Sequence, residues 1–296
     1  MILVKAPMGN LPVVIITGGT NGLGRLAALE LARKGAHLGI IARNQKKVDQ
    51  LREEIEETAP GTILDSFIAD LTSLRDVRKV GKEIDAHYER IDVLINNAGL
   101  HAFSQRITAD GFAEMMAVNY LAPWVLTNAL RDKLVTSAPA RVVTVASRAS
   151  LHSGGINPAR DLSLSADYTK RESSVLYGRS KLMDIMFTQE LARRLAGTGV
   201  TANCCCPGFN TTGLGRELPF ARILEKTLRV FRIGDPRRGA SIITRLAMDP
   251  GFSGTTGGYF SVDAAPLACP NSGQSKEIQA ELWEATASRV EEVLSS

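Results

Sequence analysis

Long apolar runs are missing from this sequence of 296 residues. No stretch approaches the roughly 20 consecutive apolar residues that cross a bilayer. Residues 1–12 are interrupted by Lys5, Pro7, Gly9 and Pro12, unlike the apolar core of a secretion signal. We therefore expect no transmembrane segment and a cytoplasmic protein.

Charge of one sign is also missing. Lys and Arg number 35 against 31 Asp and Glu, which leaves a formal net charge of +4. A protein that binds nucleic acid through its phosphates usually carries a strongly basic face or helix. Because this sequence lacks that excess, we expect a small-molecule partner and no nucleic acid.

Cysteine is scarce, with four residues in the chain. Cys204, Cys205 and Cys206 are consecutive in a stretch that reads as a buried strand, where neighbouring side chains point to opposite faces. Such neighbours are poorly placed to bridge one another, and only Cys269 remains as a partner. The pattern supports neither a disulfide framework nor a metal site, and it fits a reducing compartment.

Short apolar runs alternate with helical patterns along most of the chain. This alternation predicts an α/β architecture in which right-handed helical crossovers join parallel strands. We expect a doubly wound, seven-stranded parallel sheet flanked by helices, in a single domain. The expected strands are 13–16, 38–42, 63–69, 91–95, 141–146, 200–206 and 257–262, and the expected helices include 110–135, 174–195, 236–248 and 275–294.

A glycine-rich turn with the spacing Gly-x3-Gly-x-Gly follows the first expected strand. Glycine lets the backbone turn tightly, and the unpaired amides at the start of the next helix favour a phosphate. The turn therefore predicts a nucleotide-binding loop, although an ordinary strand-to-helix connection gives the same local signal. The residues expected to bind a cofactor here are Gly18, Thr20, Asn21, Gly22, Leu23 and Gly24.

The next strands end in residues suited to the rest of a dinucleotide. The second ends at Arg43 without the carboxylate that usually binds the ribose of NAD, and an arginine there suits the 2′-phosphate of NADP. A solvated surface arginine is the alternative. The third ends at Asp70 and Leu71, where Asp70 either accepts a hydrogen bond from adenine or only caps a turn. The fourth leads into Asn97, Ala98 and Gly99.

Four polar residues are candidates for catalysis. Ser147 directly follows the fifth strand, on the same edge of the sheet as the glycine turn. Tyr177 and Lys181 are one helical turn apart and share a helix face. Asn119 lies inside the expected helix 110–135, where asparagine has a poor propensity and an ordinary helix-bending role is the alternative.

Two irregular segments could shape a substrate pocket. Residues 148–173 are rich in Ser, Gly, Asp and Pro, so we expect a loop without a regular element. Residues 209–232 begin with turn-forming residues and continue as an apolar and basic flap. This flap reads equally well as a solvated amphipathic helix or as a contact with a membrane surface, which would make the protein membrane-peripheral.

Taken in order, TGGTNGLG, NNAG, Asn119, Ser147, Tyr177-x3-Lys181 and Pro207-Gly208 resemble the motifs of the short-chain dehydrogenase/reductase superfamily. The long separation of Ser147 and Tyr177 is similar to that of its retinol dehydrogenase branch. The resemblance implies a Rossmann-fold catalytic domain over 12–264, between an N-terminal tail, 1–11, and a C-terminal helical extension, 265–296. It also implies a homodimer or homotetramer that pairs through the two long central helices.

The resemblance implies a role for each catalytic candidate. Tyr177 would move a proton to or from the substrate oxygen, and because the usual tyrosine pKa of about 10 is high for this task, Lys181 would lower it. Lys181 would also hold the nicotinamide ribose. Ser147 would bind the substrate oxygen, and Asn119 would hold a water that relays protons. Pro207, Gly208 and Thr211 complete the expected cofactor-binding residues.

These observations predict an oxidoreductase that uses NADP(H), with NAD(H) as the less favoured cofactor and no metal. Its substrate would be a carbonyl or alcohol group of a lipophilic small molecule. Two alternatives stay open. One is a double-bond reductase like protochlorophyllide reductase, which is similar in many of these motifs. The other is a regulator that senses NADP(H) without turnover.

Overall fold

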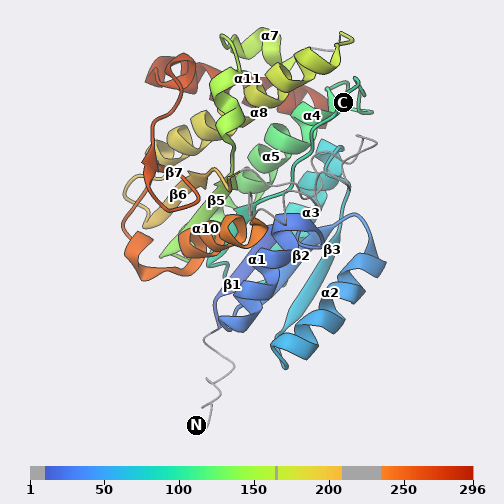
Figure 1. The fold of residues 1–296 in the computed structure, drawn as a ribbon, viewed down its shortest axis with the longest axis vertical. Coiled ribbons are helices and arrows are strands. Elements are labelled where there is room, and N and C mark those ends of the chain that lie inside the picture. Colours follow the sequence, from blue (N-terminus) through green and yellow to red (C-terminus); the bar gives the residue numbers. More distant parts are fainter. Residues whose placement is uncertain (1–10, 164–165, 209–234, 296) are drawn as a thin grey trace.

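A single sheet organises the computed structural model, which describes residues 11–163, 166–208 and 235–295. The strand order is β3-β2-β1-β4-β5-β6-β7-β8 (Figure 1). The strands are β1 (Val13–Thr17), β2 (His37–Ala42), β3 (Leu64–Ile68), β4 (Val93–Asn96), β5 (Ala140–Val145), β6 (Val200–Cys205), β7 (Tyr259–Phe260) and β8 (Pro266–Leu267). The first seven are parallel, as expected, and the sheet gains a short antiparallel edge in β8.

Helices cover both faces of the sheet (Figure 1). They are α1 (Gly22–Arg33), α2 (Gln45–Thr58), α3 (Leu74–His87), α4 (Glu114–Met116), α5 (Ala122–Ala129), α6 (Arg131–Thr136), α7 (Pro158–Leu162), α8 (Lys170–Arg194), α10 (Pro236–Met248) and α11 (Lys276–Ser295). Within the described ranges, none of them is both long and apolar enough to cross a membrane.

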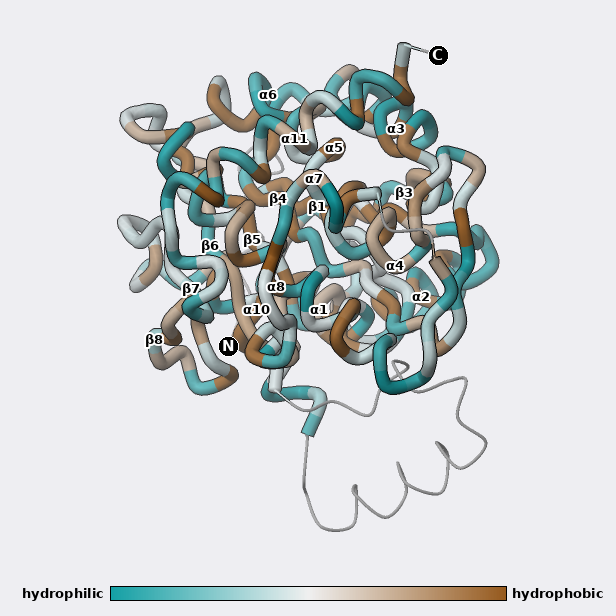
Figure 2. Tube along the Cα trace, turned by 90° about the horizontal axis from the view of Figure 1, so that it is seen from above, coloured by the Kyte–Doolittle hydropathy of each residue, from teal (hydrophilic) through white to brown (hydrophobic). Residues whose placement is uncertain are grey.

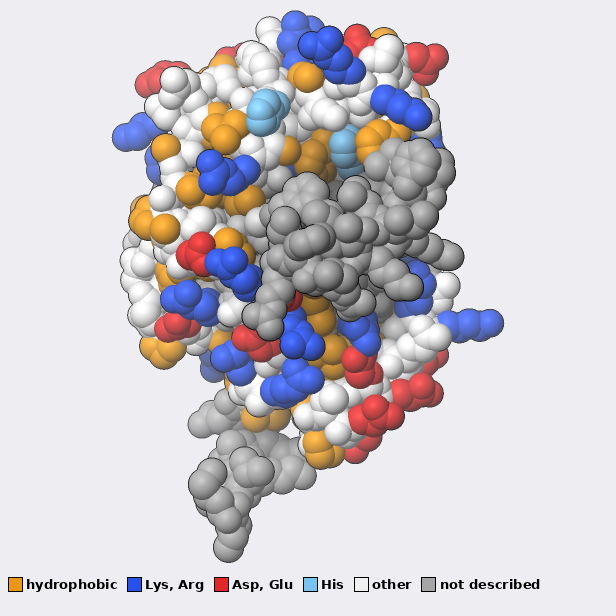
Figure 3. Space-filling model, in the orientation of Figure 1, with side chains coloured by type: hydrophobic (Ala, Val, Ile, Leu, Met, Phe, Trp, Pro, Cys, Tyr) orange, Lys and Arg blue, Asp and Glu red, His pale blue; other side chains and the backbone are white. Residues whose placement is uncertain are grey.

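The two faces of the sheet bury two separate apolar cores. Successive residues of a strand point to opposite faces, so Val14 and Ile16 pack with α1, α2 and α10, while Val13 and Ile15 pack with α3, α5, α8 and α11. Seen from above, apolar segments lie mainly inside and polar segments mainly outside (Figure 2). On the face shown in Figure 3, basic and acidic side chains are interspersed.

The helix expected over 110–135 begins at Glu114 and is not α-helical throughout. The chain forms α4, a π-helical turn from Ala117 to Leu121, α5 and α6 in succession. Single π turns are frequent at functional sites, and this one carries Asn119. The expected helix is therefore present from Glu114 onward, with a π turn at Asn119 and a turn at Leu130 between α5 and α6.

The segment 148–173 is more ordered than the sequence indicated. It contains a 3-10 helix from Arg148 to His152 and the short helix α7. Asn157 caps α7, because its side chain accepts a hydrogen bond from the Arg160 amide. Helix α8 then begins at Lys170, where Thr169 and Glu172 form a capping box. The expectation of a loop without regular elements was therefore wrong.

Helix α11 packs along α8 and joins the larger core. Trp283 is 5% exposed and stacks on Phe187 of α8, with ring centroids 5.7 Å apart and an interplanar angle of 11°. The Arg194 guanidinium, also from α8, lies 4.6 Å from the centre of the Trp283 ring. Tyr120 and Thr286 share a buried hydrogen bond of 2.8 Å. The C-terminal helix is therefore part of the folded core.

We expect Trp283→Ala to destabilise the protein by about 3–5 kcal/mol, since it leaves a cavity against Phe187 and Trp124. The control is Glu284→Ala on the same helix, which removes only an exposed ion pair with Arg194 and should cost less than about 1 kcal/mol. Urea unfolding followed by circular dichroism measures both. Equal free energies of unfolding for the two variants would contradict this account of α11.

Candidate active site

The candidate site is a cleft of about 730 Å³ at the carboxyl ends of the strands. It lies where β1 and β4 are neighbours, which is the point at which the strand order reverses and where doubly wound sheets bind ligands. The sequence-predicted residues that line it are Gly18, Thr20, Asn21, Gly22, Leu23, Gly24, Arg43, Asp70, Leu71, Asn97, Ala98, Gly99, Ser147, Tyr177, Lys181, Pro207 and Gly208. Thr211 and the flap 209–232 lie outside the described residues.

Hydrogen bonds join the ends of β1 and β4 next to the cleft. The Thr17 hydroxyl accepts from the amides of Asn97 and Ala98, at 3.0 and 2.9 Å. In return the Asn97 side chain donates to the Thr17 carbonyl at 2.8 Å. The side chain at the end of each strand therefore bonds to the backbone at the end of the other strand. These bonds fix the predicted nucleotide loop to the carboxyl end of β4.

The glycine turn has the shape that a phosphate loop needs. Gly18 and Gly22 have positive φ angles of 67° and 51°, which favour glycine. A Cβ on Gly24 would lie 2.3 Å from the Gly18 carbonyl oxygen and 2.4 Å from Asn97 Nδ2. Asn21 caps α1 by accepting from the Gly22 amide, and the first three residues of this helix line the cleft. These residues fit the diphosphate of a dinucleotide.

Two cations line the cleft beyond the end of β2. Arg43 is exposed, as the surface alternative also allows, but it lines the cleft together with Lys47. Lys47 was missed in the sequence, although its place in the first turn of α2, four residues after Arg43, was a usable signal. Asn44 caps α2 by accepting from the Lys47 amide. The pair fits a phosphate on the adenosine ribose.

Lys181 is held deep in the site by two hydrogen bonds. It is 4% exposed, and its Nζ donates to the Val145 carbonyl and to Asp184 Oδ2, both at 2.8 Å. Burial alone would lower the pKa of Lys181, but Asp184 and Tyr177 together hold it above its usual value. Lys181 is therefore a charged ammonium beside Tyr177.

Tyr177 is 9% exposed and lines the cleft beside Ser147. Burial raises the pKa of the Tyr177 hydroxyl, while the Lys181 ammonium and a hydrogen bond with Ser147 lower it and Asp184 raises it. The net pKa lies above the usual tyrosine value. Lysine thus acts in the predicted direction, but burial acts against it and is the larger effect.

Asn119 stands behind the cleft and does not line it. Its side-chain oxygen accepts from the Leu100 amide at 2.8 Å, and its Nδ2 donates to the Leu100 carbonyl at 2.9 Å and to Ser180 Oγ at 3.0 Å. Asn119 therefore fixes the segment that follows Gly99. Its expected part in a proton relay stays a prediction.

Two further residues at the site were missed in the sequence. His101 stacks on Tyr177, with ring centroids 4.8 Å apart and an interplanar angle of 15°. Nothing in the sequence around His101 indicated this contact. Asp184 had a signal, because it is a lone charge inside the apolar run from Leu182 to Phe187, which indicates a buried partner.

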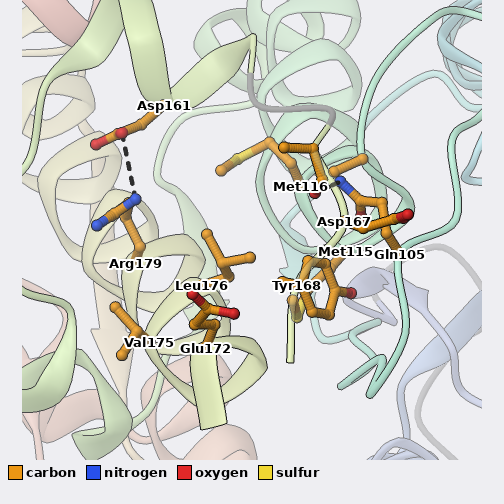
Figure 4. Close-up of a pocket in the computed structure, with 12 residues that line it drawn as sticks. Gln105, Met115, Met116, Asp161, Asp167, Tyr168, Glu172, Val175, Leu176 and Arg179 are labelled. Atoms are coloured by element: carbon orange, nitrogen blue, oxygen red, sulfur yellow. Dashed lines mark hydrogen bonds and ion pairs between the residues drawn. The ribbon is translucent and has the colours of Figure 1, made fainter. Parts of the chain in front are cut away.

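A second pocket has a volume of about 280 Å³, and Figure 4 shows residues that line it. Met115, Met116, Val175 and Leu176 give it an apolar lining, and the Asp161–Arg179 ion pair of 3.3 Å lies at one side. In three places, two residues adjacent in the sequence line different spaces, one the pocket and the other the cleft. Gln105, Met115 and Leu176 line the pocket, whereas Arg106, Glu114 and Tyr177 line the cleft. The same chain segments therefore line both spaces.

Comparison with known proteins gives a consistent result. Residues 12–159 match the model of the short chain dehydrogenase family. The chain is 39% identical to human retinol dehydrogenase 14 over 263 residues, which cover 83% of this chain and 77% of that protein. It is 35% identical over 296 residues to DnrU of Streptomyces sp. (strain C5), provisionally named a daunorubicin C-13 ketoreductase, covering 96% and 95% of the two chains.

A solved structure with a bound cofactor is also similar. It is a protein from Beutenbergia cavernae, provisionally described as an NAD(P) dependent gluconate 5-dehydrogenase, with NADP bound at low occupancy. The two chains are 26% identical and superimpose with a TM-score of 0.66, covering 86% of this chain and 95% of the other. The similarity therefore extends over most of both chains.

We expect Gly24→Ala to weaken NADPH binding by at least about tenfold, because the new methyl group must displace the Gly18 carbonyl or the Asn97 side chain. Gly155→Ala is the control, since a Cβ there meets nothing within 4 Å. A fluorescence titration with NADPH measures both variants. Unchanged binding in Gly24→Ala would show that the turn does not hold the cofactor.

Proposed function

The chain belongs to the short-chain dehydrogenase/reductase family, which acts on CH–OH and C=O groups, and from that premise we propose an NADP(H)-dependent enzyme for a lipophilic carbonyl or alcohol. The observation that carries the proposal is the single cleft that joins a phosphate-type glycine turn, two cations and the Ser147–Tyr177–Lys181 group. A nicotinamide cofactor, when bound, supplies or accepts the hydride.

The side chains manage the oxygen of the substrate. During reduction the Tyr177 hydroxyl gives its proton to the carbonyl oxygen, and during oxidation its phenolate removes that proton. Ser147 donates a hydrogen bond to the same oxygen and stabilises the negative charge that develops there. Lys181 stabilises the phenolate, which limits the cost of ionising a buried tyrosine.

The preference for NADP(H) rests on Arg43 and Lys47. Both line the cleft where a carboxylate would face the ribose of NAD, and the acids that line the cleft elsewhere are Asp70 and Glu114. A guanidinium binds a phosphate through two parallel hydrogen bonds, and a second cation adds to the attraction. The Beutenbergia cavernae structure, which contains NADP, supports this choice.

The preference for a lipophilic substrate rests on the apolar lining beside Tyr177. The pocket of Figure 4 would accept an apolar group of a molecule whose carbonyl lies in the cleft. Retinol and daunorubicin, in the names of the two relatives, point to substrates of this kind. We also propose a cytoplasmic protein that acts at membrane surfaces, where such molecules accumulate.

Tyr177→Phe should lower NADPH-dependent carbonyl reduction by at least about a hundredfold, because it removes the proton donor, while NADPH binding stays near the wild-type value. A screen of aldehydes, ketones and quinones by NADPH absorbance provides the assay. Tyr88→Phe is the control, since Tyr88 bonds to Asp65 at the opposite end of the sheet. Full activity in Tyr177→Phe would rule out this role for Tyr177.

Arg43→Ala should reduce the ratio of kcat/KM for NADPH over NADH by about tenfold, since a charged hydrogen bond to the phosphate is lost. The loss should fall on KM for NADPH and leave kcat nearly unchanged. Lys46→Ala removes a neighbouring exposed charge that does not line the cleft, so it serves as the control. If NADH is the better cofactor of the wild-type protein, the proposed preference is wrong.

A further inference from the structure

Asp184 is a buried acid in direct contact with the catalytic lysine. It follows Lys181 by three residues on α8, and its side chain has no solvent exposure. Its Oδ2 accepts from Lys181 Nζ at 2.8 Å, whereas its Oδ1 has no hydrogen-bond partner among the described residues. An unpaired buried carboxylate oxygen costs free energy, so electrostatic attraction to Lys181 must account for much of what keeps Asp184 here.

The contacts of Lys181 fix where its charge lies. An ammonium has three donors, and Val145 and Asp184 take two of them. The third remains for the cleft, which Lys181 also lines. The ammonium is thus held between a carboxylate on one side and Tyr177 on the other.

We propose that Asp184 is a positioning residue that holds Lys181 and offsets part of its charge, so that Tyr177 ionises less readily and keeps the proton that it gives up in carbonyl reduction. The proposal rests on the proposed function, since it assumes that Tyr177 exchanges the substrate proton. Asp184 takes part in no bond change. In reduction, hydride reaches the carbonyl carbon and the Tyr177 proton reaches the oxygen.

The other titratable groups around this cluster do not replace Asp184. Tyr120 of the π turn and Cys204 and Cys205 of β6 face the pair, and burial raises the pKa of each, so they are neutral at neutral pH. His101 and Cys206 face Tyr177. Burial raises the pKa of Asp184 to about 6 although Lys181 lowers it, so the carboxylate is ionised at neutral pH. It is the negative charge of the cluster.

The sign of the effect follows from the charges. Removing the carboxylate leaves Lys181 as an uncompensated positive charge near Tyr177, which favours the phenolate and lowers the tyrosine pKa. The pKa of Tyr177 should therefore be lower in Asp184→Asn than in wild type. Asparagine keeps the size of the side chain and an oxygen that can accept from Lys181.

The experiment is a near-ultraviolet titration of phenolate absorbance in the protein with NADP bound. The absorbance of the Tyr177→Phe counterpart is subtracted from that of each protein, so that only Tyr177 contributes to the difference. We expect a lower pKa in Asp184→Asn than in wild type. Glu190→Gln is the matched control, because it changes another buried acid of α8, paired with Arg193 and Arg194, and should leave the pKa unchanged. An unchanged or higher pKa in Asp184→Asn would overturn the proposal.

Two further measurements separate the possible failures. The alkaline limb of NADPH-dependent reduction of 4-nitrobenzaldehyde should move to lower pH in Asp184→Asn, whereas a merely structural role would lower kcat at every pH. Absence of turnover in wild type would count against the proposed function alone, since the titration needs none. If Asp184→Asn does not fold, Asp184→Ser, which also removes the carboxylate, takes its place in the titration. A Tyr177 pKa in Asp184→Ser equal to or above that of wild type would then refute the offset by Asp184.

Discussion

The hydrogen bonds between Thr17 and Asn97 are the constraint on which the rest of the site depends. They join the ends of β1 and β4, the two neighbouring strands between which the strand order of the sheet reverses. The same Asn97 side chain leaves no room for a Cβ at Gly24, so the glycine turn is set by β4 as well as by its own residues. One contact thus places the phosphate loop relative to the half of the sheet whose strand β5 leads to Ser147.

Most of the fold could be predicted from the sequence because buried parallel strands read as short, β-branched runs between helical patterns. All seven expected strands are present, and β8 was missed because it begins with Pro266, a residue type that is depleted in strands. The π turn inside the helix over 110–135 could not be predicted. It carries Asn119, which bonds to Leu100 and Ser180, and the periodicity of a sequence does not indicate contacts between such distant parts of the chain.

The site was predictable where it follows from topology. Residues after parallel strands meet at one edge, so the order of the strands alone places Gly18, Arg43 and Ser147 in one cleft. The pKa values of the site residues could not be predicted, because they depend on how deeply each side chain is buried. Burial raises the pKa of Tyr177 more than Lys181 lowers it. The sequence shows that Lys181 is near Tyr177, but it does not show how deeply Tyr177 is buried. His101 shows the same limit, since its stacking on Tyr177 depends on the path that the chain takes after Gly99.

Helix α11 constrains how copies of this chain can associate. The family resemblance implies pairing through the two central helices, yet α11 already lies along α8 and reaches Trp124 of α5 through Trp283. Displacing it would expose Trp283 and leave Gln279, which bonds to Gln189 and Arg193, without its partners. Such a cost would have to be recovered by the new interface. The homodimer or homotetramer that we expected would therefore form more readily on a surface that leaves α11 in place.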